Sequence, residues 1–206
     1  MEIIQGSQEW HDLRLGKITA SKIADILAVG RSGESISRKN YKLDLIRERI
    51  TGKRTEGYIN GHMERGIELE PLARATYEVL KNVTVNQVAF VEHPTINMAG
   101  ASPDGLIDHD GLLEIKCPKP ENHVDHLLNN GANLIAKYNP QVQWQLACTK
   151  RQWCDLVSFD PDMHPELQLF VTRIYRDNKW IAMAEKAVVE FDNEINESIT
   201  KLKEIV

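Results

Sequence analysis

The sequence predicts an α+β protein with a central mixed sheet flanked by helices. Segments with helical periodicity come first, strand-like segments fill the middle, and a helical region, two strands and a final helix follow. The chain has 206 residues, of which 42% are hydrophobic. Because that length supports one well-buried core, we interpret residues 1–206 as a single domain.

Three helices are expected at the start of the chain. The first runs through Ile23 to Leu27 and would be capped by Thr19 or Ser21. The second and third are expected over about 37–51 and 59–81. Gly52 would end the second helix, since glycine commonly follows a helix C-terminus. The connection at 29–37 contains glycine and serine and is expected to be the most mobile.

Strands are expected next, over about 83–92, 97–101, 105–108 and 111–117. A helical region over about 121–149 precedes two more strands at about 153–159 and 167–175. The last helix has an apolar stripe that consists of Ile181, Ala184, Val188, Phe191, Ile195 and Leu202. We interpret this stripe as a core contact, with a subunit contact as the alternative.

Composition excludes several classes of protein. The chain has no apolar run of eighteen residues, and its first residues lack the basic and apolar regions of a signal peptide, so we expect a cytosolic protein without a membrane span. Cys117, Cys148 and Cys154 form no Cys-x-x-Cys pair. They are expected to be reduced thiols rather than disulfides or ligands of zinc or an iron–sulfur cluster.

Charge is distributed unevenly along the chain. The net charge is −5, but residues 14–54 contain eleven Lys and Arg against four Asp and Glu (+7), whereas the remainder has fourteen against twenty-six (−12). A local basic surface favours phosphate binding. The alternative is a solvated helix face that carries Arg38, Lys39, Lys42, Arg47 and Arg49.

The strongest chemical signal is Asp104, followed ten residues later by Glu114 and then Lys116. Side chains alternate along a strand, so Glu114 and Lys116 share one face while their neighbours Leu113 and Ile115 enter the core. A hairpin turn at 108–111 would bring Asp104 beside Glu114. The alternative is a pair of solvated acids around an ordinary turn.

Two converging carboxylates repel each other unless a cation lies between them. A site with only hard oxygen donors suits Mg²⁺ or Mn²⁺ better than zinc. A lysine beside such a site can orient or help deprotonate an attacking water and offset charge in the transition state of phosphodiester cleavage. The pattern therefore predicts a metal-dependent nuclease.

Five blocks resemble, in order and spacing, the phage lambda exonuclease family, also called YqaJ-like viral recombinases, within the PD-(D/E)xK nuclease superfamily. The blocks are 10–21, 66–74, 102–106, 114–118 and 141–143. The resemblance covers nearly the whole chain. It implies a restriction-endonuclease-like fold and an enzyme from a bacterial host cell, encoded by a phage or prophage.

This resemblance implies an Mg²⁺-dependent exonuclease that degrades the 5′-ended strand of linear double-stranded DNA. The products would be 5′-mononucleotides and 3′ single-stranded overhangs for recombination by strand annealing. The family also implies a homotrimeric ring around DNA, a separate single-strand annealing protein as partner, and two metal ions per site, for which Mn²⁺ can substitute.

Carried over by position, Asp104, Glu114 and the backbone carbonyl of Ile115 would bind metal. Lys116 would position or activate the water, and Gln141 would help to hold the water or the scissile phosphate. The resemblance selects Glu70 as the third metal-binding acid. Helical spacing alone leaves Glu64, Glu68 and Glu70 open, although Pro71 could kink the helix at this point.

A second site would bind the terminal 5′-phosphate. Arg14 can hold phosphate with two parallel donors, and Ser21 lies at an expected helix start, which favours anions. The resemblance matches Arg14, Ser21 and Ser102 to phosphate-contacting positions. The chain departs from the family at Asn122, where a further arginine is expected, and we hypothesise that Lys119 or His123 substitutes for it.

Met63 matches a hydrophobic residue that wedges between base pairs and separates the strands, and the alternative is a core methionine. Tyr138 is a further candidate DNA contact near the site. His123 and His126 are spaced i, i+3, but without a third ligand we interpret them as a polar helix face, with DNA as a candidate partner.

Two other functions remain open. The first is a site-specific endonuclease of the same nuclease class, which would also cut closed circular DNA. The second is a non-catalytic DNA-end-binding protein, which the presence of Asp104, Glu114 and Lys116 disfavours.

Overall fold

A five-stranded sheet forms the centre of the computed structural model, with the strand order β10-β9-β8-β7-β4. These strands span Val85–Asn86 (β4), Gly105–Ile107 (β7), Gly111–Lys116 (β8), Trp153–Phe159 (β9) and Leu169–Tyr175 (β10). Strands β8 and β9 are parallel and the other neighbours antiparallel, so the sheet is mixed, as predicted. The structure describes residues 3–31, 33–55 and 61–205, without the side chains of residues 62 and 63.

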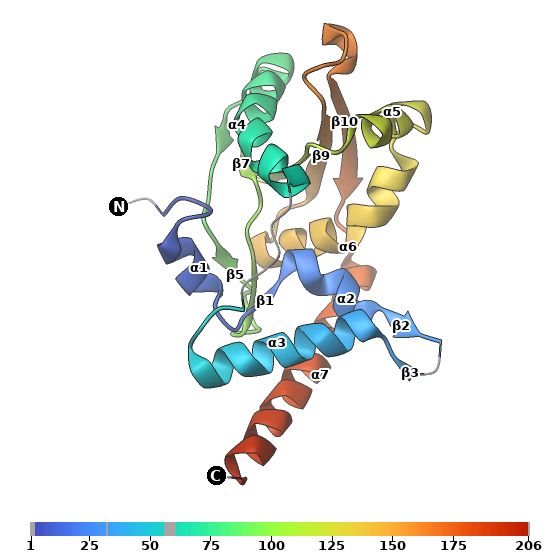
Figure 1. Cartoon of the computed structure of the whole chain (residues 1–206). Helices are drawn as coiled ribbons and strands as arrows, with labels where there is room; N and C mark the ends of the chain where they lie inside the picture. Colours follow the sequence, from blue (N-terminus) through green and yellow to red (C-terminus); the bar gives the residue numbers. More distant parts are fainter. Residues whose placement is uncertain (1–2, 32, 56–60, 206) are drawn as a thin grey trace.

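Seven α-helices occur in the described part of the chain (Figure 1). They span Gln8–Arg14 (α1), Ile23–Leu27 (α2), Ile36–Thr51 (α3), Gly61–Lys81 (α4), Pro120–Leu128 (α5), Ala132–Thr149 (α6) and Asn178–Lys203 (α7). Short 3₁₀ helices are found at Ala20–Lys22 (η1) and Pro165–Leu167 (η2). The α+β class is therefore confirmed.

Helices α4 and α6 cover opposite faces of the central sheet. Ala73 and Tyr77 of α4 join a buried cluster with Leu113 and Ile115 of β8. On the other face, α6 packs its apolar side chains around Leu112. Because residues alternate along β8, Glu114 and Lys116 lie on the α6 face. A side chain at the Glu114 position is consequently enclosed by protein.

A third cluster joins the N-terminal helices to α7. It contains residues of α2, α3 and α7 packed around Trp144 of α6. A three-stranded sheet β1-β6-β5 contributes to it, with strands at Ile18–Thr19, Val91–Glu92 and Ala99–Ala101. In Figure 1, α3 crosses α7 on the side of the molecule away from α4. The remaining strands, Val29–Gly30 (β2) and Gly33–Glu34 (β3), form a separate hairpin.

Several sequence-based expectations for the elements are confirmed. Helix α3 ends at Gly52, which adopts φ 63° in the left-handed region. The apolar stripe of α7 is buried from Ile181 to Ile195, but Leu202 is 43% exposed and does not belong to the core. The three cysteines are free thiols. No helix in the described ranges is long and apolar enough to cross a membrane.

The predicted strand at 83–92 is wrong. Val85 of β4 pairs with Ile107 in the central sheet, whereas Val91 of β5 pairs with Ala101 in the smaller one. Between them, the carbonyl of Ala89 accepts hydrogen bonds from the side chains of Trp10 and Ser102 instead of a strand neighbour. These side-chain bonds divide the segment between two sheets.

Helix boundaries near the N-terminus also differ from expectation. Helix α1 was not expected; its cap, Ser7, accepts a hydrogen bond from the Trp10 amide. Neither Thr19 nor Ser21 caps α2, because η1 precedes it and its N-cap position is Lys22, without a side-chain bond. The 29–37 connection contains the β2–β3 hairpin and the start of α3 rather than only a loop.

The expected helical region at 121–149 consists of two helices rather than one. Asn130 and Gly131 separate α5 from α6, with φ angles of 52° and 76°. Both lie in the left-handed region, which a continuing right-handed helix cannot contain. The break allows α6 to turn its apolar side chains onto the sheet.

Candidate active site

The β7–β8 hairpin places Asp104 directly beside Glu114, as the sequence predicts. Gly105 pairs with Leu113, and the Ile115 amide donates a hydrogen bond to Asp104 Oδ2 at 2.7 Å. Asp108 makes the turn possible by adopting φ 46°, a conformation that aspartate tolerates better than most residues. One acid from each strand therefore reaches the same end of the hairpin.

Glu114 is 1% exposed and has a hydrogen-bond donor for each oxygen. Its Oε1 accepts from Lys116 Nζ at 2.5 Å and from Gln141 Nε2 at 2.5 Å. Its Oε2 accepts from Gln145 Nε2 at 2.6 Å. Burial of a carboxylate is costly unless such charge-assisted bonds replace water. Gln145 completes this shell and was not identified from the sequence.

The charges around Glu114 act on its neighbours. Burial raises the pKa of Asp104 well above its usual value, and the nearby charge of Glu114 raises it further. Burial acts to lower the pKa of Lys116, but Glu114 and Asp104 outweigh it, so the pKa of Lys116 lies above its usual value. Lys116 is therefore a fixed cation at neutral pH.

Glu70 reaches the same region from α4. Burial raises its pKa and the Glu114 charge adds to this, whereas an ion pair with Arg74 acts in the opposite direction. Arg74 lies four residues after Glu70, one turn along the helix, and was not identified from the sequence. Glu64 and Glu68 are exposed. Helix α4 continues through Pro71 without a break.

A cleft of about 370 Å³ lies at this site. Its walls include Glu70, Asp104, Ile115 and Lys116, together with Tyr138, whose ring lies 4.7 Å from Lys116 Nζ. Tyr138 thus lies at the site, as expected. Acids and a lysine that face a common cleft can act together on one bound group.

The donor chemistry of this cleft suits a hard divalent cation. Asp104 and Glu114 offer adjacent carboxylates, and burial together with the charge of Glu114 raises the pKa of Asp104, so a cation between the two acids would offset their repulsion. Within residues 3–31, 33–55 and 61–205, no three His, Cys, Asp or Glu side chains converge as a complete metal site. Glu70 would have to turn from Arg74 to become the third acid.

A second cavity, of about 310 Å³, contains the predicted phosphate-binding residues Arg14 and Ser21. Lys17, Lys22 and Arg54 also line it, as do two acids, Asp44 and Glu48, so basic residues outnumber acidic ones; the sequence did not single these residues out. Burial, with the charge of Arg54, lowers the pKa of Arg14 to about 10, which still leaves it cationic. Several basic side chains around one cavity favour an anion.

Ser102 connects this basic cavity to the carboxylate cleft. Its hydroxyl accepts hydrogen bonds from Arg14 Nη1 at 3.0 Å and from Trp10 Nε1 at 3.0 Å. The Arg14 guanidinium also stacks 4.0 Å from the centroid of the Trp10 ring. Asp104 follows Ser102 by two residues, so the two cavities are held by one short segment. Trp10 was not identified as functional from the sequence.

The two proposed substitutes for the missing arginine differ in burial: His123 is buried and Lys119 is exposed. His123 is fully buried; its Nδ1 bonds to Ser158 Oγ and its Nε2 to the Leu167 carbonyl. His126 is buried too and bonds to the same hydroxyl. The predictions that His123 contacts DNA and that both histidines form a polar outer face are therefore wrong.

Lys119, by contrast, is exposed at the start of α5. It lines a small cavity of about 240 Å³ with Arg65 and Cys117, and Cys117 also borders the carboxylate cleft. Asn122 is exposed on the same helix. The side chain of Met63, the predicted wedge, lies outside the described part of the structure, so its role stays a prediction.

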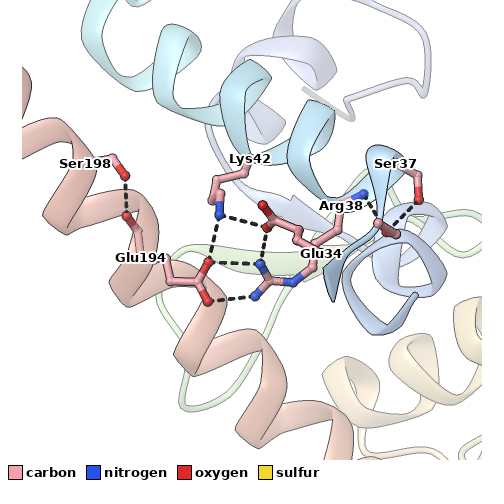
Figure 2. A network of polar contacts seen from close by, with 7 residues as sticks. Glu34, Ser37, Arg38, Lys42, Glu194 and Ser198 are labelled. Carbon is pink, nitrogen blue, oxygen red and sulfur yellow. Dashed lines mark hydrogen bonds and ion pairs between the residues drawn. The ribbon is translucent and has the colours of Figure 1, made fainter. Parts of the chain in front are cut away.

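Much of the basic charge at 14–54 pairs with acids of the same chain. Arg38 and Lys42 of α3 form ion pairs with Glu34 and with Glu194 of α7, as Figure 2 shows. Arg49 pairs with Asp192. These side chains connect α3 to α7 and are therefore not free to bind phosphate.

Comparison with known proteins gives consistent results. The family model described as the YqaJ-like viral recombinase domain matches residues 9–152. Comparison with curated protein sequences gives no match. Among solved structures, the alkaline exonuclease LHK-Exo from Laribacter hongkongensis is 43% identical, with a TM-score of 0.88 over 96% of this chain and 97% of that chain.

Two further structures are similar. LHK-Exo in complex with dAMP is 42% identical, with a TM-score of 0.89 over 96% of this chain and 97% of that one. A phage-related exonuclease from Haemophilus somnus 129PT shares the fold at 14% identity, with a TM-score of 0.72 over 90% of this chain and 96% of that chain. The chain belongs to the family of YqaJ-like viral recombinases.

Proposed function

We propose that this protein is a metal-dependent 5′-to-3′ exonuclease that acts on linear double-stranded DNA. It would hydrolyse phosphodiester bonds from a 5′-phosphorylated end, release 5′-mononucleotides and leave 3′ single-stranded overhangs for recombination by strand annealing. The observation that carries the proposal is the cleft lined by Asp104 and Lys116, with the buried Glu114 bonded to Lys116, together with the basic cavity of Arg14.

The relatives support the reaction class. LHK-Exo is described as an alkaline exonuclease and shares 43% identity over almost the whole chain, and one of its structures contains dAMP, a 5′-mononucleotide. The match of residues 9–152 to a viral recombinase domain supports a role in recombination. An enzyme that works from DNA ends is consistent with both.

Lys116 would orient the attacking water and offset negative charge in the transition state. Its raised pKa makes it a poor proton acceptor at neutral pH, so we assign it an electrostatic role rather than that of a general base. Gln141, whose amide donates to the same Glu114 Oε1 as Lys116, would help to hold the water or the scissile phosphate. Tyr138 would bound the space in which the phosphate lies.

Asp104, Glu114, the Ile115 carbonyl and Glu70 would hold Mg²⁺, or Mn²⁺ in its place, with two ions per site. A bound divalent cation supplies Lewis acidity and lowers the pKa of water. Filling the site requires Glu70 to exchange Arg74 for the cation. Because the water must lose a proton and the carboxylates must be ionised, cleavage should increase toward alkaline pH.

The basic cavity would recognise the 5′ end. Arg14 and Ser21 line it. Ser102 accepts a hydrogen bond from Arg14 and lies two residues before Asp104 in the chain. A terminal phosphate bound there would fix which nucleotide reaches the carboxylates, which would set the polarity. Met63 and Lys119 would contact the DNA as strand wedge and phosphate partner.

The proposed assembly follows from the resemblance to the family. We propose a homotrimeric ring that encloses the duplex and a single-strand annealing protein that receives the 3′ overhang. Light scattering coupled to size exclusion should give three times the mass of the chain. A monomeric mass, or loss of linear substrate only in the presence of other proteins, would contradict this part.

The reaction is tested by a time course on linear duplex with 5′-phosphate or 5′-hydroxyl ends, labelled at either the 5′ or the 3′ terminus. Closed circular DNA serves as the control. We expect Mg²⁺-dependent mononucleotide release from the 5′ label, faster with the phosphate, and intact circles. Cutting of circles would indicate an endonuclease, and end binding without release would indicate a non-catalytic protein.

A further inference from the structure

Gln145 contacts Glu114, one of the carboxylates of the proposed active site. Its amide donates to Glu114 Oε2 at 2.6 Å, whereas Lys116 and Gln141 both donate to Oε1. Gln141 and Gln145 are spaced i, i+4, so α6 presents both amides on one face at successive turns. Each oxygen of Glu114 thus has its own donor on this helix.

The two glutamines differ in exposure. Gln141 is partly exposed, whereas Gln145 is fully buried. A group that enters from solvent can compete for the Gln141 amide, because Gln141 is partly exposed. Gln145 has no such competitor, so its bond to Oε2 persists whatever Lys116 and Gln141 contact during a reaction cycle.

The other end of the Gln145 amide is unsatisfied. Its Oε1 is buried and has no hydrogen-bond donor in the described structure. A buried polar atom without a partner destabilises a fold by roughly 1–3 kcal/mol, and an apolar residue of similar length would avoid this. Packing alone therefore does not explain a glutamine at this position. The hydrogen bond that its amide donates to Glu114 does explain it.

We propose that Gln145 is a positioning residue that fixes the orientation of the Glu114 carboxylate toward the bound cation. This inference rests on the proposed metal-dependent function. Residues that orient a metal ligand through such a bond commonly change metal affinity by roughly 10- to 100-fold when removed. Gln145 acts through Glu114 and touches neither substrate nor cation.

Gln143 provides a matched control on the same helix. It is 2% exposed, and its amide bonds to the Tyr175 carbonyl and the Asp177 amide instead of Glu114. Gln143→Met and Gln145→Met remove the same atoms from equally buried positions. A general defect in the packing of α6 would affect both variants, whereas loss of Glu114 orientation would affect only Gln145→Met.

The test is calorimetric titration of Mn²⁺ into the full-length protein without DNA, with thermal unfolding measured in parallel. We expect Gln145→Met to weaken Mn²⁺ binding by roughly 10- to 100-fold, with the Mn²⁺ concentration for half-maximal cleavage shifted by the same factor. Gln143→Met should bind Mn²⁺ like wild type even if its melting temperature falls. If Gln145→Met does not fold, Gln145→Asn, which withdraws the amide by one methylene, replaces it.

Equal Mn²⁺ affinity in Gln145→Met and wild type would overturn the inference while leaving the proposed function intact. Equal weakening in Gln143→Met would also overturn it, because packing would then explain the effect. No Mn²⁺ binding by the wild type would refute the proposed metal dependence itself and this inference with it.

Discussion

Two lysine–glutamate pairs in this protein are alike in chemistry and different in surroundings. Lys116 and Glu114 lie 2.5 Å apart, with side-chain exposures of 21% and 1%. Lys42 and Glu194 lie 3.0 Å apart, with exposures of 19% and 40%. The lysines are equally covered, so the difference is the burial of the acid.

The burial of the acid distinguishes the Lys116–Glu114 pair of the proposed active site from the structural Lys42–Glu194 pair. Water screens Glu194, and its pairs with Arg38 and Lys42 join α3 to α7 (Figure 2). Glu114 has no water to screen it, so its charge acts on Asp104, Glu70 and Lys116 and shifts their pKa values. Burial of one carboxylate thus couples a whole group of charges.

The largest effect is expected at Asp104. Asp104→Asn should reduce Mg²⁺-dependent cleavage of linear duplex by on the order of 10³-fold, since it removes a charge that would hold the proposed cation. The same variant should melt at a higher temperature than wild type at pH 8 without metal. Differential scanning fluorimetry and mononucleotide release measure the two effects.

The higher melting temperature expected for Asp104→Asn follows from the raised pKa of Asp104. Burial is the main cause of this raised pKa, and the charge of Glu114 is the second. An acid whose pKa is higher in the folded state stabilises folding less as pH rises through that folded pKa. The advantage of Asp104→Asn should therefore disappear at acid pH, and Mg²⁺ should raise the melting temperature of wild type only. Equal melting at pH 8 would contradict the buried-charge explanation.

A smaller effect is expected at the basic cavity. Arg14→Ala removes the guanidinium that Ser102 and Trp10 hold in place, and should lower the preference for 5′-phosphate over 5′-hydroxyl ends by about 10- to 100-fold. Cleavage of 5′-hydroxyl ends should change much less. Competition between the two substrates in one reaction measures the ratio, and an unchanged ratio would place phosphate recognition elsewhere.

The smallest effect is expected at the α3–α7 network. Hydrogen bonds from Arg38 and Lys42, opposed by partial burial, lower the pKa of Glu194 to about 2. The stabilisation is present above the unfolded pKa, about 4.3, and is lost as pH falls toward 2. Glu194→Gln should reduce the free energy of unfolding by about 1 kcal/mol at pH 7 and by much less at pH 2.

Urea titrations at both pH values test this, with nuclease activity as the control. Activity should stay within about twofold of wild type, because the network touches neither cavity. If Glu194→Gln had normal stability and impaired cleavage, the α3–α7 network could not be distinguished from the proposed active site as a purely structural contact.

The central residues of the proposed active site could be predicted from the sequence because strand alternation and hairpin geometry are local properties. The Asp104, Glu114 and Lys116 arrangement follows from pairing across one short turn. Gln145 and Arg74 were missed although each lies four residues from a residue that had been selected, Gln141 or Glu70. Their contacts depend on how α6 and α4 pack on the sheet, which i, i+4 spacing does not reveal.

Tertiary partners also account for the errors. His123 was expected near DNA, but its bonds to Ser158 and Leu167 come from elements more than thirty residues away. Likewise, the basic stretch at 14–54 was interpreted as a phosphate surface, but Glu194 and Asp192, which pair with its Arg38, Lys42 and Arg49, lie far away in the sequence on α7. Charge patterns identify the residues but not their partners.

The most direct test is single-turnover cleavage of 5′-phosphorylated linear duplex with saturating Mg²⁺ by Lys116→Ala and Lys42→Ala in parallel. The account predicts that Lys116→Ala loses cleavage by on the order of 10³-fold while it remains folded and binds DNA. Lys42→Ala should cleave within about twofold of wild type and melt at a lower temperature. Wild-type cleavage by folded Lys116→Ala would contradict the account.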